Sequence, residues 1–322
     1  MNEHSQTKAP TAMLIAAFAT IYLLWGSTYT AIRIVVETLP PFLAAGVRFL
    51  IAGGLMLAVL AARGTPLPSR ALWRHATITG TLMLVGGNGL VMWAERTLSS
   101  GFTALLIALV PVWFALLDWA RPRGVRPQLK TVAGIFIGFL GIALLVRARG
   151  GFASMNGQWW GALAIMVSGF CWAGGTLCAK YQTNTSSPWM TSAAQMLCGG
   201  VGLMLVALLR GEPWHTDWSH VSGRSVAALG YLIVFGSWIA YSAYVWLLHN
   251  TTPARLSTYA YVNPIIAVFL GWVLLNEKVN SGMLWAAAII VLGVATITVP
   301  PSAVASVVRR CSRYVFARLK TL

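Results

Sequence analysis

The feature that most constrains how this chain can fold is an internal duplication of its apolar segments. A shift of 147 positions superimposes the two halves at several places: Trp25 on Trp172, Arg33 on Lys180, Pro41 on Pro188, Arg48 on Gln195 and Gly53 on Gly200. A shift of 153 positions superimposes Pro111 on Pro264 and Trp119 on Trp272. Such a repeat fixes the architecture before any single motif does. Two apolar repeats in one chain are typical of secondary transporters, which bind solute between the repeats.

The composition places the chain in a lipid bilayer. Of its 322 residues, 57% are hydrophobic and 9% are charged, whereas soluble domains carry about 25% charged residues. A chain of this kind cannot hide its apolar surface inside a water-soluble shape. The net charge of +16 would suit nucleic acid, but the basic residues lie between apolar runs instead of on one polar face. We therefore expect membrane lipid around the protein and no nucleic-acid partner.

The apolar runs are long enough for ten membrane-spanning helices, since a span needs about 20 apolar residues. The expected spans are residues 12–36, 41–62, 72–95, 99–119, 129–146, 159–181, 188–209, 225–248, 254–275 and 283–299. Each half contributes five, and an odd number makes the second half enter the membrane in the opposite sense. The predicted fold is an all-α integral membrane protein with ten transmembrane helices, arranged as two inverted five-helix repeats.

The same pattern divides the chain into four parts. They are a first repeat at 12–147, a linker at 148–158, a second repeat at 159–299 and a basic cytoplasmic tail at 300–322. The first apolar run is too long for a signal-peptide core, so we expect an uncleaved first span. The tail mixes apolar residues with cations. That composition suits either an amphipathic helix on anionic lipid or a disordered segment that enforces topology.

The distribution of Lys and Arg sets the predicted orientation. With the N-terminus inside, the inner segments hold fifteen of the 23 basic residues, the outer loops hold seven, and Arg48 lies within the second span. Cytoplasmic segments of membrane proteins carry the excess of Lys and Arg. We therefore expect a multi-pass protein of the cell inner membrane with both termini in the cytoplasm.

The sequence has no motif for catalysis or for a cofactor. The patterns Gly-x-x-x-x-Gly-Lys, His-Glu-x-x-His and Gly-x-Ser-x-Gly are all missing, so we expect neither an enzyme nor ATP hydrolysis. The four cysteines are Cys171, Cys178, Cys198 and Cys311. None belongs to a CxxC pair, which argues against a disulfide framework or a zinc site. His215 and His220, in the long outer loop at 211–224, are a weak metal signal, and we expect no metal.

Arg48 is the strongest anomaly within the apolar runs. It lies about 10 Å into the second span, because seven residues of helix separate it from Pro41. A cation at that depth is costly unless it faces a wet cavity or a partner. Arg48 either binds an anionic group of a substrate or bonds backbone carbonyls as a packing cation. Its repeat-mate Gln195 is also polar, so both halves direct a hydrogen-bonding side chain from the same place.

Two carboxylates are candidates for coupling transport to an ion gradient. Of the seven acidic residues, Glu95 and Asp118 lie at span ends close enough to reach an interior path. Arg96 adjoins Glu95, but neighbouring residues of a helix do not face each other. The alternative is that both carboxylates are interfacial anchors.

Polar residues and prolines interrupt three of the spans. Asn88 lies in the segment 86–89, whose glycines permit close packing or a kink. Asn263-Pro264 in the ninth span and Pro111 in the fourth are expected to break helices at matched repeat positions. A mid-span proline frees a carbonyl, and paired interruptions point to a transporter site. A structural kink is the alternative.

Aromatic residues converge on the same spans, and the sequence does not separate cavity lining from lipid-facing belt. They are Trp25, Tyr29, Trp93, Trp113, Trp172, Trp238, Tyr241, Tyr244, Tyr259 and Tyr261. The faces of such rings bind apolar and cationic groups. The substrate-binding site that we predict combines polar groups with aromatic walls: Arg48, Asn88, Gln195, Asn263, Trp25, Trp172, Tyr241 and Tyr259.

Several short motifs resemble the EamA family of the drug/metabolite transporter superfamily. They are Leu24-Trp25-Gly26-Ser27-Thr28-Tyr29, Ala44-Ala45-Gly46-Val47-Arg48-Phe49-Leu50 and Ser257-Thr258-Tyr259-Ala260-Tyr261-Val262-Asn263-Pro264. The turn Asn276-Glu277-Lys278 resembles the family's Gly-Glu turn, with Asn in place of Gly. The first half departs there and has Asp118-Trp119-Ala120-Arg121. The likeness covers residues 12–299 and is greatest to YedA-like inner-membrane exporters.

The resemblance implies an inverted-repeat fold with a central cavity and with helices five and ten as a peripheral scaffold. It implies export of small metabolites, amino acids among them, or of drugs. We expect a small-molecule substrate, alternating access at a midplane site and no cofactor. A glycine stripe in the fifth span, Gly134, Gly138 and Gly141, suits a scaffold contact or a homodimer contact.

Other functions fit parts of the sequence. A lipid or lipid-linked solute flippase would need a lateral opening between helices, and a carrier for metabolite uptake or exchange would use the same fold. An intramembrane enzyme would need a convergent acid–base or nucleophile pair, against which the scarcity of Asp, Glu and His argues. A non-transporting interaction protein would leave the duplication and the paired prolines unexplained.

Overall fold

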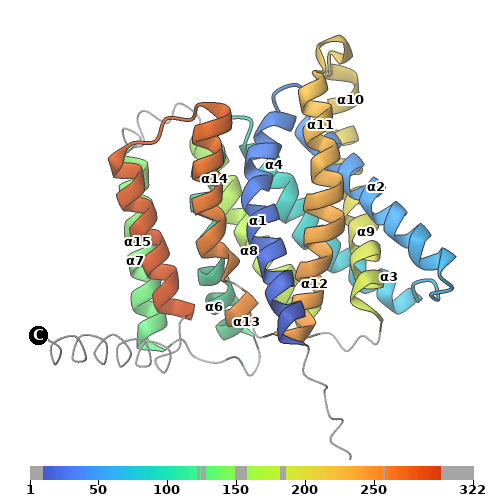
Figure 1. Ribbon diagram of the computed structural model, residues 1–322, viewed down its shortest axis with the longest axis horizontal. Coiled ribbons are helices and arrows are strands. Elements are labelled where there is room, and N and C mark those ends of the chain that lie inside the picture. The colour runs from blue at the N-terminus through green and yellow to red at the C-terminus, as the bar shows by residue number, and fades with distance from the viewer. Residues whose placement is uncertain are drawn as a thin grey trace, which may run out of the picture.

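The protein is a bundle of long apolar helices, seen here in a computed structural model (Figure 1). The structure describes residues 10–121, 124, 128–148, 158–181, 186–251, 253–256 and 258–298. Regular elements in these ranges are all helical, which confirms the predicted all-α class. Eight of the described helices are long and apolar enough to cross a membrane, and two shorter apolar helices are Val262–Leu275 and Ser281–Thr296. Most of the predicted linker, the predicted tail and Cys311 lie outside the described residues.

The helices follow the expected spans closely. In the first half they are α1 Thr11–Val35, α2 Pro41–Ala62, α3 Arg70–Gly80, η1 Thr81–Gly89, α4 Leu90–Ala94, α5 Ser100–Ile107, α6 Val110–Ala120 and α7 Leu129–Ala148. In the second half they are α8 Gln158–Lys180, α9 Pro188–Leu209, α10 Glu212–His215, η3 Trp218–His220, α11 Gly223–Tyr231, η4 Leu232–Ile239, α12 Ala240–Asn250, α13 Pro253–Leu256, α14 Tyr259–Leu275 and α15 Ser281–Thr298.

Serine caps and prolines set where several helices begin. The hydroxyls of Ser69, Ser187 and Ser222 accept hydrogen bonds from backbone N–H groups in the first turns of α3, α9 and α11. Pro41 and Pro188, which are repeat-mates, stand in the first turns of α2 and α9. A serine cap satisfies one orphan N–H, and a proline there loses no hydrogen bond.

Pro111 and Pro264 do not act alike, contrary to the prediction of matched helix breaks. Pro111 stands in the first turn of α6, after a break that separates it from α5. Pro264 lies inside the continuous helix α14. The amide of Asn263, oriented by its partners, donates to the carbonyls of Tyr259 and Tyr22 at 3.2 Å. This turn of α14 therefore keeps a donor although Pro264 has no N–H. In this half, the long helix α14 begins at Tyr259, after the short helix α13 and later than the expected span 254–275.

The third long helix of each half contains a π-helical segment. In the first half, η1 joins α3 to α4; in the second, η4 joins α11 to α12. A shift of 153 carries residues 81–89 onto 234–242, which overlaps η4 at 232–239. Segments of π-helix are rare and are frequent at functional sites. Their matched positions indicate that the interruption of the α-helical hydrogen-bond pattern is a shared feature of the two halves.

Helices α2 and α9 cross with their backbones in close contact. A Cβ added at Gly53 would lie 2.9 Å from Met196 Cβ and 3.1 Å from the carbonyl oxygen of Ala193. A Cβ added at Gly46 would lie 3.4 Å from the carbonyl oxygen of Gly200. The earlier glycine of α2 thus meets the later part of α9, so the two helices run antiparallel. The shift of 147 pairs residue 46 with 193 and 53 with 200, so the crossing makes the same contact twice.

Helices α7 and α15 pack on each other at one side of the bundle, on the left in Figure 1. A Cβ added at Gly293 of α15 would lie 2.6 Å from Gly138 N and 2.8 Å from the Gly134 carbonyl oxygen. One added at Gly141 would lie 2.6 Å from Ile290 Cγ1. The glycine stripe of α7 is therefore occupied by α15 of the same chain, and a homodimer stays a prediction.

The turn after α14 fastens that helix to α5. Asn276 has a φ of 52°, in the left-handed region that Gly and Asn adopt most easily. The carboxylate of Glu277 accepts hydrogen bonds from the N–H groups of Ser100 (2.7 Å) and Gly101 (3.2 Å) and from the Ser100 hydroxyl (2.9 Å). These donors belong to the first turn of α5, so Glu277 caps that helix. Its negative charge also interacts favourably with the positive end of the helix dipole.

Matched cations close the third long helix of each half. Lys180, at the end of α8, donates to the carbonyl of Leu248 at 2.9 Å, near the end of α12. Arg33, near the end of α1, donates to the carbonyls of Glu95 and Arg96, just beyond α4. Each cation satisfies carbonyls that have no partner within their own helix. Arg33 and Lys180 are repeat-mates, so this contact also occurs twice.

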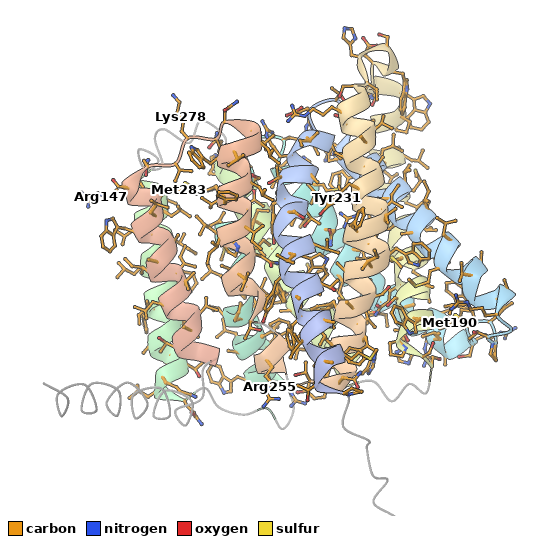
Figure 2. All side chains as sticks on the ribbon, in the orientation of Figure 1. Arg147, Met190, Tyr231, Arg255, Lys278 and Met283 are labelled. Atoms are coloured by element: carbon orange, nitrogen blue, oxygen red, sulfur yellow. The ribbon has the colours of Figure 1, made fainter. Side chains whose placement is uncertain are left out.

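The charged loops lie at two opposite ends of the bundle. Helix α1 begins and α15 ends at the lower end in Figure 1. Figure 2 shows Arg255 at the lower end, and Arg147 and Lys278 at the upper end. The described part of the chain therefore enters and leaves the bundle at one end.

The α2–α9 crossing can be tested with neighbouring glycines. A Cβ at Gly53 meets Met196 at 2.9 Å, whereas a Cβ at Gly54 has nothing within 4 Å. We expect Gly53→Ala to lower the free energy of unfolding by about 1–3 kcal/mol through overpacking. Gly54→Ala is the matched control and should leave it unchanged or slightly higher. Thermal unfolding of the purified chains in detergent is the measurement, and equal melting temperatures would contradict the tight crossing.

The Glu277 cap can be tested in the same way. We expect Glu277→Ala to cost about 1–3 kcal/mol, because two backbone N–H groups at the start of α5 lose their acceptor. Glu37→Ala is the control, since Glu37 forms an exposed ion pair with Arg224 at 3.8 Å. Such pairs contribute about 0–1 kcal/mol. A loss at Glu37 as large as the loss at Glu277 would show that the cap has no special weight.

Candidate functional site

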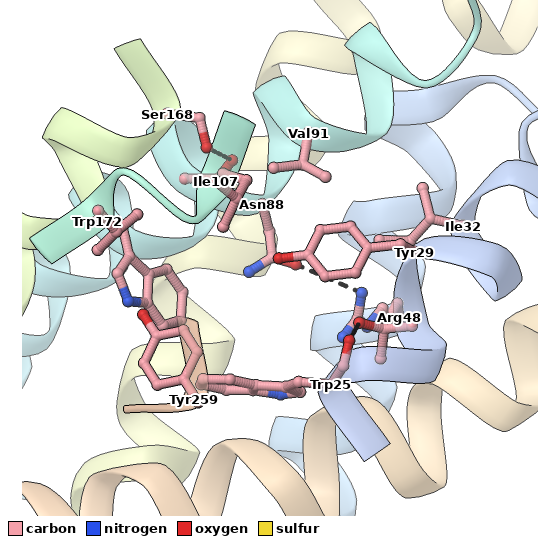
Figure 3. A pocket seen from close by; sticks show the side chains of 13 residues that line it. Trp25, Tyr29, Ile32, Arg48, Asn88, Val91, Ile107, Ser168, Trp172 and Tyr259 are labelled. Atoms are coloured by element: carbon pink, nitrogen blue, oxygen red, sulfur yellow. Dashed lines mark hydrogen bonds between the residues drawn. The ribbon is translucent and has the colours of Figure 1, made fainter. Parts of the chain in front are cut away.

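A small central cavity lies where helices of both halves meet (Figure 3). Its lining comes from α1, α2, η1, α4, α8 and α14 and from the chain around the α5–α6 break. The cavity has a volume of about 70 Å³. Five of the eight predicted site residues line it: Trp25, Arg48, Asn88, Trp172 and Tyr259.

Arg48 is the charged member of this lining, and it is almost fully buried, at 2% exposure. Its Nε donates to the hydroxyl of Ser237 at 2.6 Å. Its Nη1 makes a long contact of 3.5 Å with Oδ1 of Asn88. Within the described part of the chain, Arg48 forms no ion pair. A guanidinium has five N–H donors, so these two contacts leave donors for another acceptor.

The two π-helical segments shape the cavity through their backbones. Ser168 of α8 donates to the carbonyl of Gly87 in η1 at 2.8 Å. The indole N–H of Trp25 in α1 donates to the carbonyl of Gly236 in η4 at 3.2 Å. Each π segment therefore gives a carbonyl to a side chain of the other half. A Cβ added at Gly236 would lie 2.9 Å from Nη2 of Arg48, so the guanidinium rests on bare backbone there.

Aromatic rings form one wall of the cavity. The ring of Trp25 lies 5.4 Å from Trp172, 4.9 Å from Tyr244 and 5.4 Å from Tyr259, in edge-on or tilted arrangements. The buried indole N–H of Trp172 lies near the hydroxyls of Tyr259 (Figure 3) and Tyr244, outside good hydrogen-bond geometry. A small shift of the rings would let this donor bond to either hydroxyl or to an acceptor on a solute.

The cavity is narrow for a solute. Its volume is about 70 Å³. Sites for small molecules usually measure about 300–1,000 Å³, so solute entry requires the walls to move apart. A larger hollow of about 530 Å³ is lined by apolar side chains of α5, α14 and α15, such as Phe269 and Met283. It offers almost nothing to orient a polar group.

Gln195 and Tyr241 lie outside the cavity lining, in a buried network of their own. Nε2 of Gln195 donates to the Thr79 hydroxyl at 2.9 Å, and its Oε1 accepts from the Tyr241 hydroxyl at 2.9 Å. A shift of 153 carries Asn88 onto Tyr241. In each half, the polar residue of the second helix thus contacts the matched position of the third. The structure brings these two residues beside the cavity, since Tyr241 also packs on Trp172 with ring centroids 6.3 Å apart.

The remaining predicted residue, Asn263, supports the cavity without lining it. It is buried, at 2% exposure, and its amide donates to the backbone carbonyl of Tyr259. Pro264 lines the apolar hollow instead of the central cavity, and Pro111 starts α6 beside the lining residue Val110.

Sequence reasoning missed Ser237, and it named Tyr29 and Tyr244 among the aromatic candidates without selecting them for the site. Ser237, the main partner of Arg48, is 189 residues away in the chain. Its signal was a hydroxyl beside a glycine in the middle of an apolar span. Tyr29 lines the cavity and lies four residues after Trp25, on the same helix face. Tyr244 packs on Trp25 and bonds to the Thr176 hydroxyl at 2.8 Å.

The two coupling candidates have opposite surroundings. Glu95 is fully buried, and neither carboxylate oxygen has a hydrogen-bond partner. Asp118 is 30% exposed, lies 2.5 Å from Nε of Arg121 and accepts a hydrogen bond from the Tyr181 hydroxyl at 3.3 Å. Asp118 is therefore satisfied as an anchor at a helix end, whereas no hydrogen-bond donor in the described part of the chain meets the carboxylate of Glu95.

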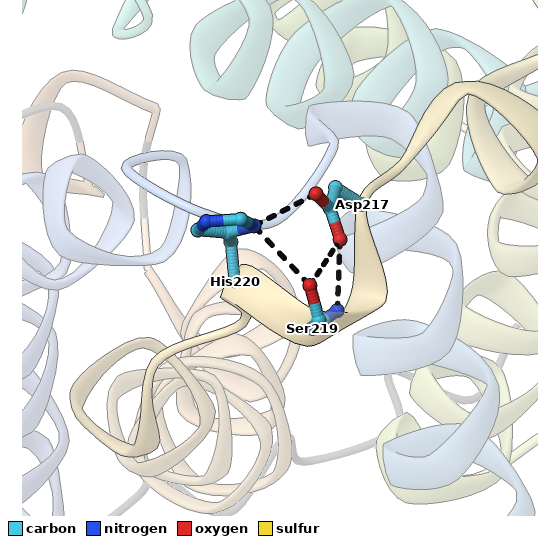
Figure 4. Close-up of polar contacts among 3 residues, drawn as sticks. All are labelled: Asp217, Ser219 and His220. Carbon is cyan, nitrogen blue, oxygen red and sulfur yellow. Dashed lines mark hydrogen bonds and ion pairs between the residues drawn. The ribbon is translucent and has the colours of Figure 1, made fainter.

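The histidines of the loop at 211–224 do not form a metal site. Figure 4 shows the carboxylate of Asp217 accepting hydrogen bonds from the Ser219 hydroxyl (2.6 Å), the Ser219 N–H (3.0 Å) and the His220 ring (2.7 Å). These bonds, that of the Ser219 hydroxyl foremost, hold the pKa of Asp217 below its usual value. His215 bonds elsewhere, to the Gly211 carbonyl at 2.7 Å. The described residues contain no group of three potential metal ligands.

Comparison with known proteins agrees with this architecture. The chain matches the EamA-like transporter family over residues 11–147 and 159–299. It is 40% identical over 288 residues to the "Uncharacterized inner membrane transporter YedA" of Escherichia coli K12, covering 88% of this chain and 90% of the relative. It is 29% identical over 268 residues to an "Uncharacterized transporter" of Archaeoglobus fulgidus, covering 80% and 87%.

A solved crystal structure shares the fold, with a TM-score of 0.66 at 22% identity, covering 90% of this chain and 98% of that chain. The family match spans both halves of the chain, and its members are transporters and not enzymes. The expectation that the chain is not an enzyme is thereby confirmed. The chain is a multi-pass membrane protein that belongs to the EamA-like transporter family.

Proposed function

We propose that the protein is a secondary transporter that exports small amphipathic solutes with an anionic group, such as amino acids, related metabolites or drugs, across the cytoplasmic membrane. The observation that carries this proposal is Arg48: a buried cation with no ion pair in the described chain, in a cavity with aromatic walls. No catalytic group or cofactor is needed for this activity.

The chemistry of the cavity favours this class of solute. A buried cation without a counter-charge is destabilising, and the attraction of a solute carboxylate offsets part of that cost. A guanidinium binds a carboxylate through two parallel N–H donors. The rings of Trp25, Trp172 and Tyr259 would take the apolar part of the solute, and the indole N–H of Trp172, poorly placed for the neighbouring hydroxyls, would meet a polar atom.

The proposed architecture is two inverted repeats of five membrane-spanning helices each, at 12–147 and 159–299, joined by a linker at 148–158. Three features that occur in both halves support it. They are the antiparallel α2–α9 crossing, the capping cations Arg33 and Lys180, and the two π segments. The ninth and tenth spans would be α14 and α15, which are shorter than the others. Inverted repeats bind solute at their interface, where the cavity lies.

Alternating access follows from the difference between the two halves. Arg48 faces the cavity, whereas its repeat-mate Gln195 is sealed in a network with Thr79 and Tyr241. In an inverted repeat the two halves exchange conformations, so the seal around Gln195 would open when the cavity side closes. Solute would then meet Arg48 from one side of the membrane and leave toward the other.

We propose that both termini lie in the cytoplasm. The described chain enters and leaves the bundle at one end, and the predicted inner segments carry most of the Lys and Arg. The similar protein from Escherichia coli is named an inner membrane transporter, which supports the same membrane for this chain. Lipid flipping is the alternative that the apolar hollow of about 530 Å³ between α14 and α15 favours, since acyl chains could fill it.

The role of Arg48 predicts the outcome of a single substitution. We expect Arg48→Gln to fold, because glutamine occupies the matched position of the second half, and to lose the charge that binds the solute. Losing charge-assisted hydrogen bonds costs about 1.5–3 kcal/mol, so export should fall about tenfold to hundredfold. Arg63→Gln, at the exposed end of α2, is the control and should keep export.

The measurement is exometabolite profiling of one host that expresses wild type or either variant to equal levels in the membrane. Anionic amphipathic solutes should accumulate in the medium with wild type and with Arg63→Gln. Unchanged accumulation with Arg48→Gln would remove Arg48 from the site. Identical media for wild type and empty host would contradict export, and phospholipid scrambling or solute uptake would then be measured.

A second substitution tests the bare backbone under Arg48. A Cβ at Gly236 would lie 2.9 Å from Nη2 of Arg48 and 3.0 Å from Cγ2 of Thr28, whereas a Cβ at Gly230 has nothing within 4 Å. We expect Gly236→Ala to displace the guanidinium and to reduce export about tenfold, the effect of a loss of about 1.4 kcal/mol. Gly230→Ala, in the same span, should behave as wild type. Equal export from both would show that Arg48 needs no fixed position.

A further inference from the structure

Glu95 is a buried acid that the proposed solute site does not use. It follows the end of α4 and has 0% exposure. Neither of its carboxylate oxygens has a hydrogen-bond donor within reach. A charged carboxylate buried without a donor is strongly destabilised, so this conformation favours the neutral acid.

The charged and titratable groups that act on Glu95 come from helix α1 and from the turn after α14. Arg33 of α1 lies next to it, but its guanidinium is bonded to the backbone carbonyls of Glu95 and Arg96. Tyr29 of α1 and Glu277, after α14, lie within electrostatic reach. The negative charge of Glu277 opposes ionisation of Glu95, and the positive charge of Arg33 favours it. Any movement of α14 or α1 would change this balance.

Neighbours of Glu95 line two hollows of the protein. Tyr29 lines the central cavity with Arg48. Arg33 and Glu277 line a polar cavity of about 370 Å³ at the upper end of the bundle. The exposed pair of Glu37 and Arg224, 3.8 Å apart, lines the same end cavity. A small opening at α14 would thus give Glu95 access to water from that end.

The repeat shows that packing does not require an acid at this position. A shift of 153 carries Glu95 onto Leu248, which is also buried, at 2% exposure, and also lies beside a capping cation. The second half fills the place with an apolar side chain at no electrostatic cost. An ionisable group kept in such a place against its cost indicates a function.

We propose that Glu95 is the proton-binding site that couples solute export to proton entry. This inference rests on the proposed export function. One proton from water in the end cavity binds the carboxylate when the upper end is open, and the neutral acid then permits α14 and α5 to close over it. When the central cavity opens to the other side, the carboxylic acid releases that proton to water there and becomes a carboxylate again. One proton would therefore enter for each solute that leaves.

Protonation can be measured without knowing the solute. Infrared difference spectra of the purified full chain in lipid, between acidic and alkaline buffer, should show the C=O stretch of a buried carboxylic acid, with a shift in D₂O. That band should be missing in Glu95→Gln and present in Asp118→Asn, which removes an exposed, ion-paired carboxylate. If Glu95→Gln fails to reach the membrane, Glu95→Leu replaces it, because Leu248 fills the matched position.

Coupling is measured as export of the solutes that wild-type cells enrich, in acidic and in alkaline medium. Wild type and Asp118→Asn should export faster in acidic medium, by up to about tenfold per pH unit for a step that needs one proton. The Glu95 variant should lose this dependence. An identical infrared band in wild type and variant, or a preserved pH dependence in the variant, would overturn the proton site. No enrichment by wild type would overturn export itself, while the infrared arm would still decide whether Glu95 binds the proton.

Discussion

The close backbone contact between α2 and α9 is the constraint on which the rest of the structure depends. In a membrane, apolar surface gives helices no reason to associate, so tight packing must supply the attraction. Gly53 against Ala193 and Gly46 against Gly200 allow this packing, and each contact is the repeat of the other. The crossing holds the second helix of each half at the centre of the bundle. Arg48 is thereby carried to the cavity, because it projects from the same stretch of α2.

Duplication lets one scaffold carry two kinds of chemistry. The second half repeats the packing of the first but replaces its ionisable residues: Gln195 stands for Arg48, and Leu248 stands for Glu95. The shared features are those that hold helices together, such as the caps made by Arg33 and Lys180. The features that differ are buried charges, which cost stability and so persist where they serve a purpose. Comparing the halves therefore separates scaffold from function inside a single chain.

Much of the fold could be predicted from the sequence, because the lengths of the apolar runs and their repetition can be read directly from the order of the residues. The depth of Arg48 in its span was also readable, since helix rise converts position into distance. The hydrogen bonds that Arg48 donates to Ser237 and that the start of α5 donates to Glu277 could not be predicted, because they join segments far apart in the chain. The π segments were hidden, since an apolar run has the same composition in either helix type. Pro264 was expected to break α14, but a neighbouring amide supplies the turn with a donor.

The narrowness of the central cavity has a consequence for the cell that carries the protein. A space of about 70 Å³, walled largely by rings, leaves little room for a continuous file of water across the bundle. Ions that rely on such a file would meet a barrier there, so we expect the resting protein to preserve the electrical insulation of the membrane. Leakage would be confined to the brief rearrangements, on the microsecond-to-millisecond scale, that accompany each turnover. A cell could thus hold many copies of this carrier without draining the voltage across its membrane.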